Sequence, residues 1–379
     1  MNAATIVNQR EPALDLLRIL SMIMVVCLHC CNHGGLVEGA LVPGTVNYVL
    51  GNTVFALAFV SVNCFVLLSG YFQCTSRFKL SRAASTWLQA FFYSVLFCLV
   101  INIIYPGEGI SLVKELIKSG MVVSMSQYWF VTAYLLMYAV SPFLNCAIQA
   151  MDRTKHLLCC MVLIGIFSVA HNIVYINDFG GVRGGSSFLW FCIIYMIAAY
   201  FRLYRPQGKR SAKGLFFAYL LCALVTAAER VAAQYITPMI FGRVVLNSLF
   251  FSYNSIFTLA ASCFLFLCFR ELSISNQRVC RIISAVAPLA FGVYLIHDNR
   301  FVRPILWESL NPAAYAESPW LLLYMALCVI GIFAICCVIE KLRQIIFTQC
   351  RINALVKNWS DKVQSTVLQQ LETNRKNKN

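Results

Sequence analysis

The sequence predicts an all-α, polytopic integral membrane protein, and three observations support this fold class. Apolar residues make up 60% of the 379 residues and charged residues only 12%, about half the charged share of an average soluble chain. Apolar runs of about 20 residues, the length of a transmembrane helix, recur along the whole chain. Lysine and arginine gather between alternate runs. This composition excludes an ordinary soluble domain.

Ten apolar runs are expected to be transmembrane helices, at residues 14–32, 50–72, 84–105, 127–146, 157–176, 187–203, 214–236, 246–269, 282–298 and 319–342. With a cytoplasmic N-terminus, 22 of the 30 lysine and arginine residues fall on the cytoplasmic side and seven on the outer side. Cytoplasmic loops are enriched in these residues, so the distribution predicts that both termini are cytoplasmic. It also explains the net charge of +15 without nucleic acid as a partner.

Residues 1–345 are expected to form one membrane domain, and residues 346–379 a cytoplasmic amphipathic tail. Apolar residues in the tail recur every three or four positions between Ile352 and Leu371. This pattern is typical of a helix that lies on the inner membrane face or packs on a partner. The 18 cysteines show no CxxC or zinc-ligand spacing, so most are expected to be small buried apolar residues. Neither a metal nor a cofactor is expected.

The first apolar run carries the clearest indication of a functional site. Arg18 and His29 are separated by ten residues, which on a helix corresponds to about three turns and roughly 16 Å. Both side chains therefore leave the same face. Asp15 precedes Arg18 by three residues and can pair with it. Ionisable side chains within a span normally face a bundle interior or a wet cavity. The alternative is that Arg18 anchors the helix at the headgroups and His29 is an interfacial residue.

Four segments together resemble the acyltransferase family 3 membrane proteins, which include O-acetyltransferases of bacterial surface and exported polysaccharides. The segments are the Arg18–His29 pair, FVLLSGYF at 65–72, YWFVTAYLLMYAVSPFLN at 128–145 and FGVYLIHD at 291–298. The family often has glycine after the arginine, where this chain has Ile19. The resemblance implies an O-acyltransferase in a bacterial cell membrane. It would move an acyl group, most simply acetyl from acetyl-CoA, to a hydroxyl of a glycan or lipid-linked sugar.

The cytoplasmic end of the second span offers candidates for donor binding. Ser69 and Gly70 lie at this end, and Arg77 and Arg82 follow in a basic cluster. Glycine permits close backbone approach, and basic side chains beside it can receive a phosphate group. The same cluster is also explained as a topology signal. The family resemblance favours contact between Arg77 or Arg82 and a donor nucleotide.

Two later spans supply candidates on the outer side. Trp129 lies at the start of the fourth span, where aromatic residues commonly form an interfacial belt; the alternative is that Trp129 stacks on a sugar. Tyr294 and His297 lie three residues apart at the end of the ninth span and are followed by Asp298. Tyr294 and His297 share a helix face and end on the same side as His29. They are either a plain helix end or part of the acceptor site.

The expected chemistry centres on His29, as general base on the acceptor hydroxyl or as a nucleophile that carries the acyl group. Arg18 is expected to bind an anionic donor group or to orient the site through Asp15. Asp298 or Glu38 is expected to orient His29.

Two other functions remain open from the sequence. The competing class is a transporter or flippase for a glycan or lipid-linked substrate, in which intramembrane charges form a substrate path. Such proteins often contain paired repeats, and none is evident in this sequence. Haem ligation by His29 together with His171 or His297 is the third hypothesis.

Overall fold

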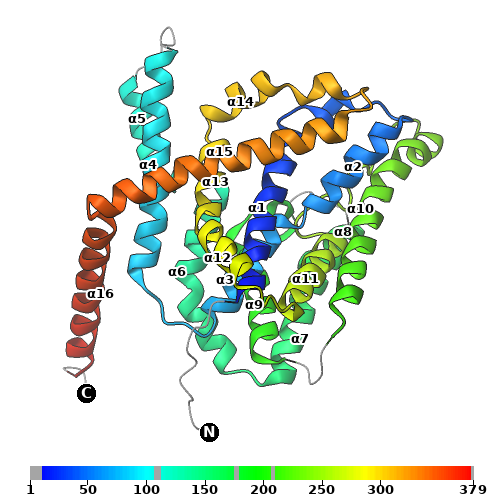
Figure 1. Cartoon of the computed structure of the whole chain (residues 1–379). Helices are drawn as coiled ribbons and strands as arrows, with labels where there is room; N and C mark the ends of the chain where they lie inside the picture. The colour runs from blue at the N-terminus through cyan, green and yellow to red at the C-terminus, as the bar shows by residue number, and fades with distance from the viewer. Residues whose placement is uncertain (1–10, 106–111, 175–178, 206–209, 377–379) are drawn as a thin grey trace.

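The protein is described by a computed structural model, which covers residues 11–105, 112–174, 179–205 and 210–376. Residues 1–10 of the expected membrane domain and 377–379 of the expected tail lie outside the described residues. The described residues form a helical bundle and contain no strand, which confirms the all-α membrane fold (Figure 1).

Sixteen α-helices lie within the described residues: α1 Pro12–Asn32, α2 Val46–Ala58, α3 Ser61–Gln73, α4 Leu80–Ile104, α5 Leu112–Gly120, α6 Trp129–Gln149, α7 Arg153–Ile164, α8 Ala170–Val174, α9 Phe188–Leu203, α10 Ala212–Phe241, α11 Ile256–Glu271, α12 Gln277–Val286, α13 Ala290–His297, α14 Val302–Leu310, α15 Leu321–Gln349 and α16 Ile352–Lys376. Short π- or 3₁₀-helical segments join several of them: η1 Leu36–Ala40, η2 Gly165–Val169, η3 Phe179–Gly181, η4 Arg183–Gly185, η5 Ala287–Leu289 and η6 Pro312–Tyr315.

Eight helical segments of the described chain are long and apolar enough to cross a membrane: Pro12–Ala40, Val46–Gln73, Leu80–Ile104, Trp129–Gln149, Arg153–Ile173, Ala212–Phe241, Gln277–His297 and Leu321–Gln349. The two other expected spans correspond to α9 and α11, which have 16 residues each. Sixteen residues extend about 24 Å, less than the hydrocarbon thickness of about 30 Å. Ten residues of α9 are buried, because this helix lies inside the bundle against α3, α6 and α7. The predicted count of ten complete spans is therefore not confirmed.

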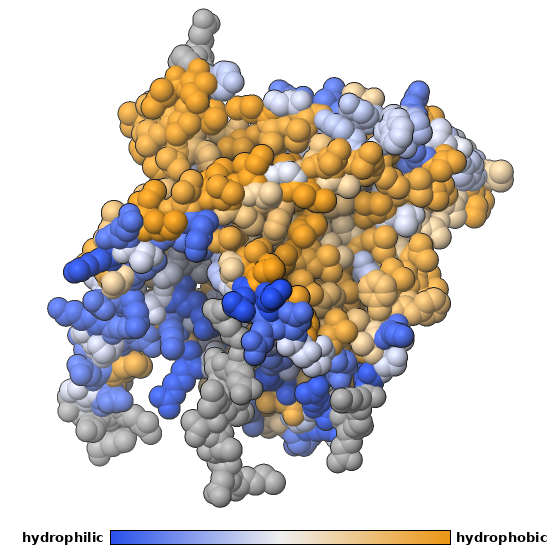
Figure 2. Space-filling view, viewed as in Figure 1, coloured by the Kyte–Doolittle hydropathy of each residue, from blue (hydrophilic) through white to orange (hydrophobic). Residues whose placement is uncertain are grey.

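The surface is divided in the way that a membrane requires. Hydrophobic side chains cover a broad band across the middle of the molecule, and hydrophilic side chains gather at the end toward which α16 runs (Figure 2). The start of α1 faces the same end (Figure 1). The loops after α3 and α6 also lie at this end (Figure 1). Its placement in the cytoplasm stays a prediction.

A topology experiment tests this orientation. We expect reporters inserted after Ala40 and after Met151 to report opposite sides of the membrane, with the second in the cytoplasm. Ala40 ends η1 beyond the outer end of α1, whereas Met151 lies between α6 and α7 at the opposite end of the bundle. Paired phosphatase and fluorescent-protein fusions measure this directly, and the same side for both positions would contradict the topology.

Helix α1 lies at the centre of the bundle and contributes to two buried clusters. Leu14 and Leu17, in its first turns, pack with residues of α3, α9 and α11. Val26 and Leu28, nearer its outer end, pack with residues of α13 and α15. Because α1 is held on several sides, the face that carries Arg18 and His29 has a fixed direction inside the protein.

Helix α16 packs along α4 within the same chain. The Gln364 side chain accepts a hydrogen bond from the Leu80 backbone N–H at 2.8 Å and donates one to the Phe78 carbonyl at 3.2 Å. It thereby satisfies a backbone donor in the first turn of α4. The expected domain boundary at residue 345 falls inside α15, which continues to Gln349. Of the apolar stripe of the tail, Ile352, Val356 and Val363 are half-buried, whereas Leu355, Trp359, Val367 and Leu371 remain exposed.

Candidate active site

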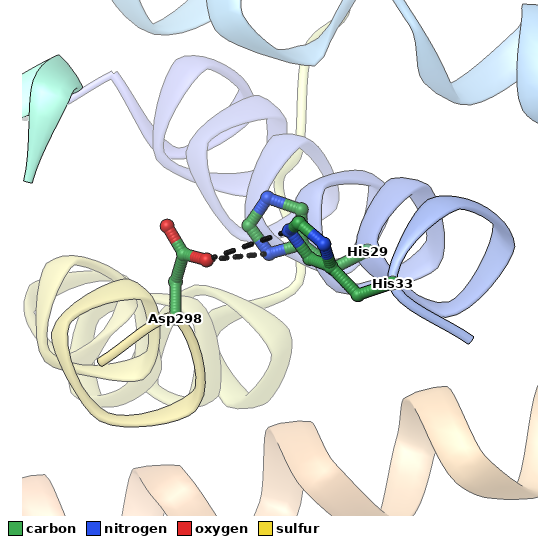
Figure 3. A group of neighbouring side chains, drawn as sticks. All are labelled: His29, His33 and Asp298. Atoms are coloured by element: carbon green, nitrogen blue, oxygen red, sulfur yellow. Dashed lines mark ion pairs between the residues drawn. The ribbon is translucent and has the colours of Figure 1, made fainter. Parts of the chain in front are cut away.

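Four ionisable side chains meet near the outer end of α1. His29 and His33 are one helical turn apart, so they leave the same face, and His297 and Asp298 come from the end of α13, which packs on α1. The Nδ1 atom of His29 lies 2.9 Å from Nε2 of His297 and 3.7 Å from Oδ1 of Asp298. The same Asp298 oxygen lies 3.7 Å from Nε2 of His33. Figure 3 shows Asp298 facing both His29 of α1 and His33, which directly follows this helix.

The hydrogen bonds determine which ring nitrogen of His29 carries the proton. His297 Nδ1 lies 2.6 Å from the Val293 carbonyl oxygen, and a carbonyl can only accept, so the proton is on Nδ1. The Nε2 atom of a neutral His297 is then an acceptor, and the His29 Nδ1–H donates to it. The lone pair of His29 consequently lies on Nε2, the atom that can accept a proton or attack a carbonyl.

Tyr128, which precedes α6, holds the end of α13 in place. Its hydroxyl donates to the Leu295 carbonyl at 2.9 Å and accepts from the Asn299 side chain at 2.7 Å. Tyr128 is fully buried, so these bonds are made away from solvent. Tyr128 thereby helps to keep His297 beside α1, a role that the sequence pattern did not reveal because an interfacial tyrosine is common.

The residue that contacts His29 most closely is not the one that the sequence suggested. Asp298 was expected to orient His29, and His297 to lie on the acceptor side. His297 is instead the nearest partner of His29. Asp298 lies between the pair His29 and His33 and Arg303, whose Nη1 donates to Asp298 Oδ1 at 3.4 Å. Glu38, the other expected orienting residue, lies with His33 at a more external cavity. Arg303 was not a sequence candidate because it looked like an ordinary outer-loop arginine.

The ligand set of His29, His33 and Asp298 has the composition of a transition-metal site, with one ligand atom of each within 4.8 Å of the others. Two features oppose a cation at this point. The Nδ1 atom of His29 is already engaged by His297. The Arg303 guanidinium also lies against the same Asp298 oxygen, where it would repel a metal ion. We interpret the group as a hydrogen-bonded ion-pair cluster.

A series of four adjoining cavities runs past α1 from its N-terminal half, the inner end of the predicted topology, to its C-terminal end. The inner cavity has a volume of about 410 Å³ and is lined by residues including Arg18, Ser69 and Arg82. Arg18 pairs with Asp15 on the same helix, as its spacing predicted. Arg77 is exposed and is not among the lining residues. The structure therefore brings three of the four expected inner residues together and leaves Arg77 apart.

Gly70 does not face a ligand. A Cβ atom at this position would lie 2.9 Å from the Tyr195 Cα atom, so the missing side chain allows α3 and α9 to pack closely. The neighbouring Ser69 hydroxyl donates to the Phe65 carbonyl in its own helix at 2.9 Å. Ser69 lines the inner cavity, but its proton is already used within α3.

The inner cavity narrows to a throat that leads to His29. Phe65, Phe130 and Phe291 line both the inner cavity and the throat, whose volume is only about 40 Å³. Tyr294 also lines the throat, together with His29. Tyr294 is thus on the approach from the inner side, although the sequence suggested the acceptor side.

Two further cavities continue outward from the throat. The histidine cavity, of about 240 Å³, is lined by His29, Trp129, Asp298 and Arg303, and it shares His29 and Trp129 with the throat. The outer cavity, of about 440 Å³, shares His33 and Arg303 with the histidine cavity. His29 therefore lies where the cavities beside the N-terminal half of α1 meet the cavities at its C-terminal end.

A helical membrane bundle with a histidine at the junction of two approaches is the architecture expected of a membrane-embedded transferase. A family model described as an acyltransferase domain matches residues 11–340, a range that includes every cavity residue named above. The chain belongs to acyltransferase family 3, which confirms the resemblance of its four sequence segments. No curated protein and no solved structure matches the chain.

Proposed function

We propose that this membrane acyltransferase moves an acyl group from a cytoplasmic acyl-CoA to a hydroxyl of a glycan or lipid-linked sugar outside the membrane. Acetyl-CoA is the simplest donor, and the cell membrane of a bacterium is the proposed location. The position of His29 carries the proposal, because this residue lines both the throat and the histidine cavity. A donor from the inner cavity and an acceptor from outside would meet there.

The inner cavity and the throat differ in charge and width, and these differences suit the two ends of an acyl-CoA. Arg18 and Arg82 give the inner cavity two guanidinium groups, which suit the phosphates of a nucleotide. The throat is narrow and mostly apolar in its lining, so it suits the uncharged thioester arm and excludes the nucleotide. The throat separates Arg18 from His29, which supports a donor-binding role for Arg18 and leaves the chemistry to His29.

The free Nε2 lone pair of His29 supports either of two balanced routes. As a general base, Nε2 takes the acceptor proton while the hydroxyl oxygen attacks the thioester carbonyl; the C–S bond breaks and the thiolate receives that proton. As a nucleophile, Nε2 forms a C–N bond to the acyl carbon and expels the thiolate. The acceptor oxygen then attacks that carbon, the C–N bond breaks to return neutral His29, and the hydroxyl proton neutralises the thiolate. A burst of free thiol without acceptor, equal to the amount of enzyme, would identify the second route.

Family membership supports the enzyme over a transporter or flippase. The deciding experiment measures free CoA thiol in reconstituted vesicles with and without a glycan acceptor. Acceptor-dependent thiol release is expected; movement of unmodified glycan without thiol release would favour the transporter.

We expect Arg82→Ala to raise the KM for acyl-CoA about ten- to a hundredfold, because a hydrogen bond to a charged group is worth roughly 1.5–3 kcal/mol. Arg82 lines the inner cavity. Arg77→Ala is the matched control, since it removes an exposed arginine five residues away. The measurement is the donor concentration dependence of transfer per inserted protein. Equal effects of the two substitutions would contradict donor binding by Arg82 and would leave both arginines as a topology signal only.

A further inference from the structure

The outer cavity has the features of a built binding site. It is formed by the end of α1, η1, α14 and η6, and its volume of about 440 Å³ lies within the ~300–1,000 Å³ of small-molecule sites. Gly35, at a φ of 74°, turns the chain directly after α1, a conformation that suits glycine. This turn brings Glu38 back to the cavity that His33 also lines.

Two carboxylates in the outer cavity have no ion-pair partner among the described residues. Glu38 comes from η1 and Glu308 from α14, and both are exposed to the cavity. The nearest lining cation, Arg303, is already bonded to Asp298. Arg230 interacts with Glu38 at longer range, but it forms no ion pair with it, donates to the Val37 carbonyl and is not a lining residue of the cavity. The free charge that the outer cavity presents is therefore negative.

Trp307 lines the same cavity and carries a buried hydrogen-bond donor. Trp307 is only 3% exposed, and its indole Nε1 has no hydrogen-bond partner among the described residues. A buried N–H without an acceptor costs free energy that a bound oxygen atom would recover. The side-chain amides of Asn32 and Asn311 complete the polar lining.

Building on the proposed function, we propose that the outer cavity binds the acceptor as an uncharged, polyhydroxylated sugar and rejects acidic sugars. Glu38 and Glu308 would each accept hydrogen bonds from sugar hydroxyls. The Trp307 indole would donate to a ring or hydroxyl oxygen. A uronic acid would place a third negative charge beside two unpaired carboxylates, a repulsive contact that confers specificity. Through His33 and Arg303 the cavity leads to His29, where the reacting hydroxyl would be acylated.

The test compares two acceptors of equal length, a neutral maltooligosaccharide and an oligogalacturonide, in the reconstituted enzyme. Wild type should prefer the neutral acceptor. The double variant Glu38→Gln and Glu308→Gln should raise the KM for the neutral acceptor about five- to tenfold. It should also use the acidic acceptor better than wild type does, so the preference for the neutral acceptor becomes smaller. Trp307→Phe should also raise the KM for the neutral acceptor, because it keeps a ring and removes the N–H. Glu317→Gln is the control, since Glu317 is an exposed outer carboxylate away from the cavity lining.

The outcomes separate this inference from the proposed function. Transfer to the oligogalacturonide equal to or better than transfer to the maltooligosaccharide would overturn the inference and leave acyl transfer intact. Glutamine variants that behave like Glu317→Gln would overturn it as well. Absence of acceptor-dependent thiol release from wild type, with hydroxylated acceptors of either charge, would instead contradict the proposed function itself.

Discussion

His29→Ala is expected to abolish acyl transfer while the protein still inserts and folds. His29 lines the throat and the histidine cavity, and its Nδ1 bond to His297 leaves Nε2 as the base or nucleophile. Loss of a general base typically costs about 10²–10⁴-fold in rate, and loss of a covalent nucleophile can cost more. The measurement is acylated acceptor per unit of membrane-inserted enzyme.

His33→Ala is the matched control for this substitution. His33 is the same residue type four positions later, and it contacts Asp298 at the same distance of 3.7 Å as His29 does. It lies just after the end of α1 and does not line the throat. We expect a mild effect. Near-normal activity of His29→Ala, or equal losses in both variants, would exclude His29 as the chemical residue.

Replacing His297 by leucine is expected to lower the rate about ten- to a hundredfold without removing a reacting group. His297 accepts the Nδ1 proton of His29 and thereby places the lone pair on Nε2. The positive charge that develops on His29 during reaction strengthens this bond, and a bond to a charged group is worth roughly 1.5–3 kcal/mol, which is about one to two decades in rate. The effect should fall on kcat.

Rescue by a conservative variant distinguishes positioning from packing. His297→Gln offers an amide oxygen that can accept the same proton, so it should restore most of the rate lost in His297→Leu. Unfolding temperature of the purified variants checks that both fold. If leucine and glutamine lose activity equally, or if KM for the donor changes while kcat does not, the positioning role of His297 is excluded.

The sequence predicted the fold class and the face shared by Arg18 and His29, because helical periodicity and hydrophobic length are local properties. The contact between His29 and His297 was not predictable, because it depends on how α13 packs on α1, 268 positions along the chain. The same limit applies to Arg77 and Arg82. Both belong to one basic cluster in the sequence, but only Arg82, in the first turn of α4, lines the inner cavity.

The two remaining differences between the sequence predictions and the structure, at α9 and at the tail, concern which surfaces are buried. Apolar composition alone cannot distinguish a helix that faces lipid from one that faces protein, so α9 was expected to be a complete span although it is short and enclosed. The amphipathic pattern of the tail likewise predicted a helix, but it did not predict that this helix packs along α4. The side-chain bonds of Gln364 to residues at the start of α4 depend on the tertiary fold.

The central claim is that His29 joins a cytoplasmic donor to an outer acceptor. The most direct test supplies acyl-CoA only to the cytoplasmic face of sealed vesicles and a maltooligosaccharide only to the outer face. The structure predicts acylated acceptor on the outer side with wild-type enzyme and none with His29→Ala. Product that forms only when donor and acceptor are supplied on the same face, or that still forms with His29→Ala, would contradict the claim.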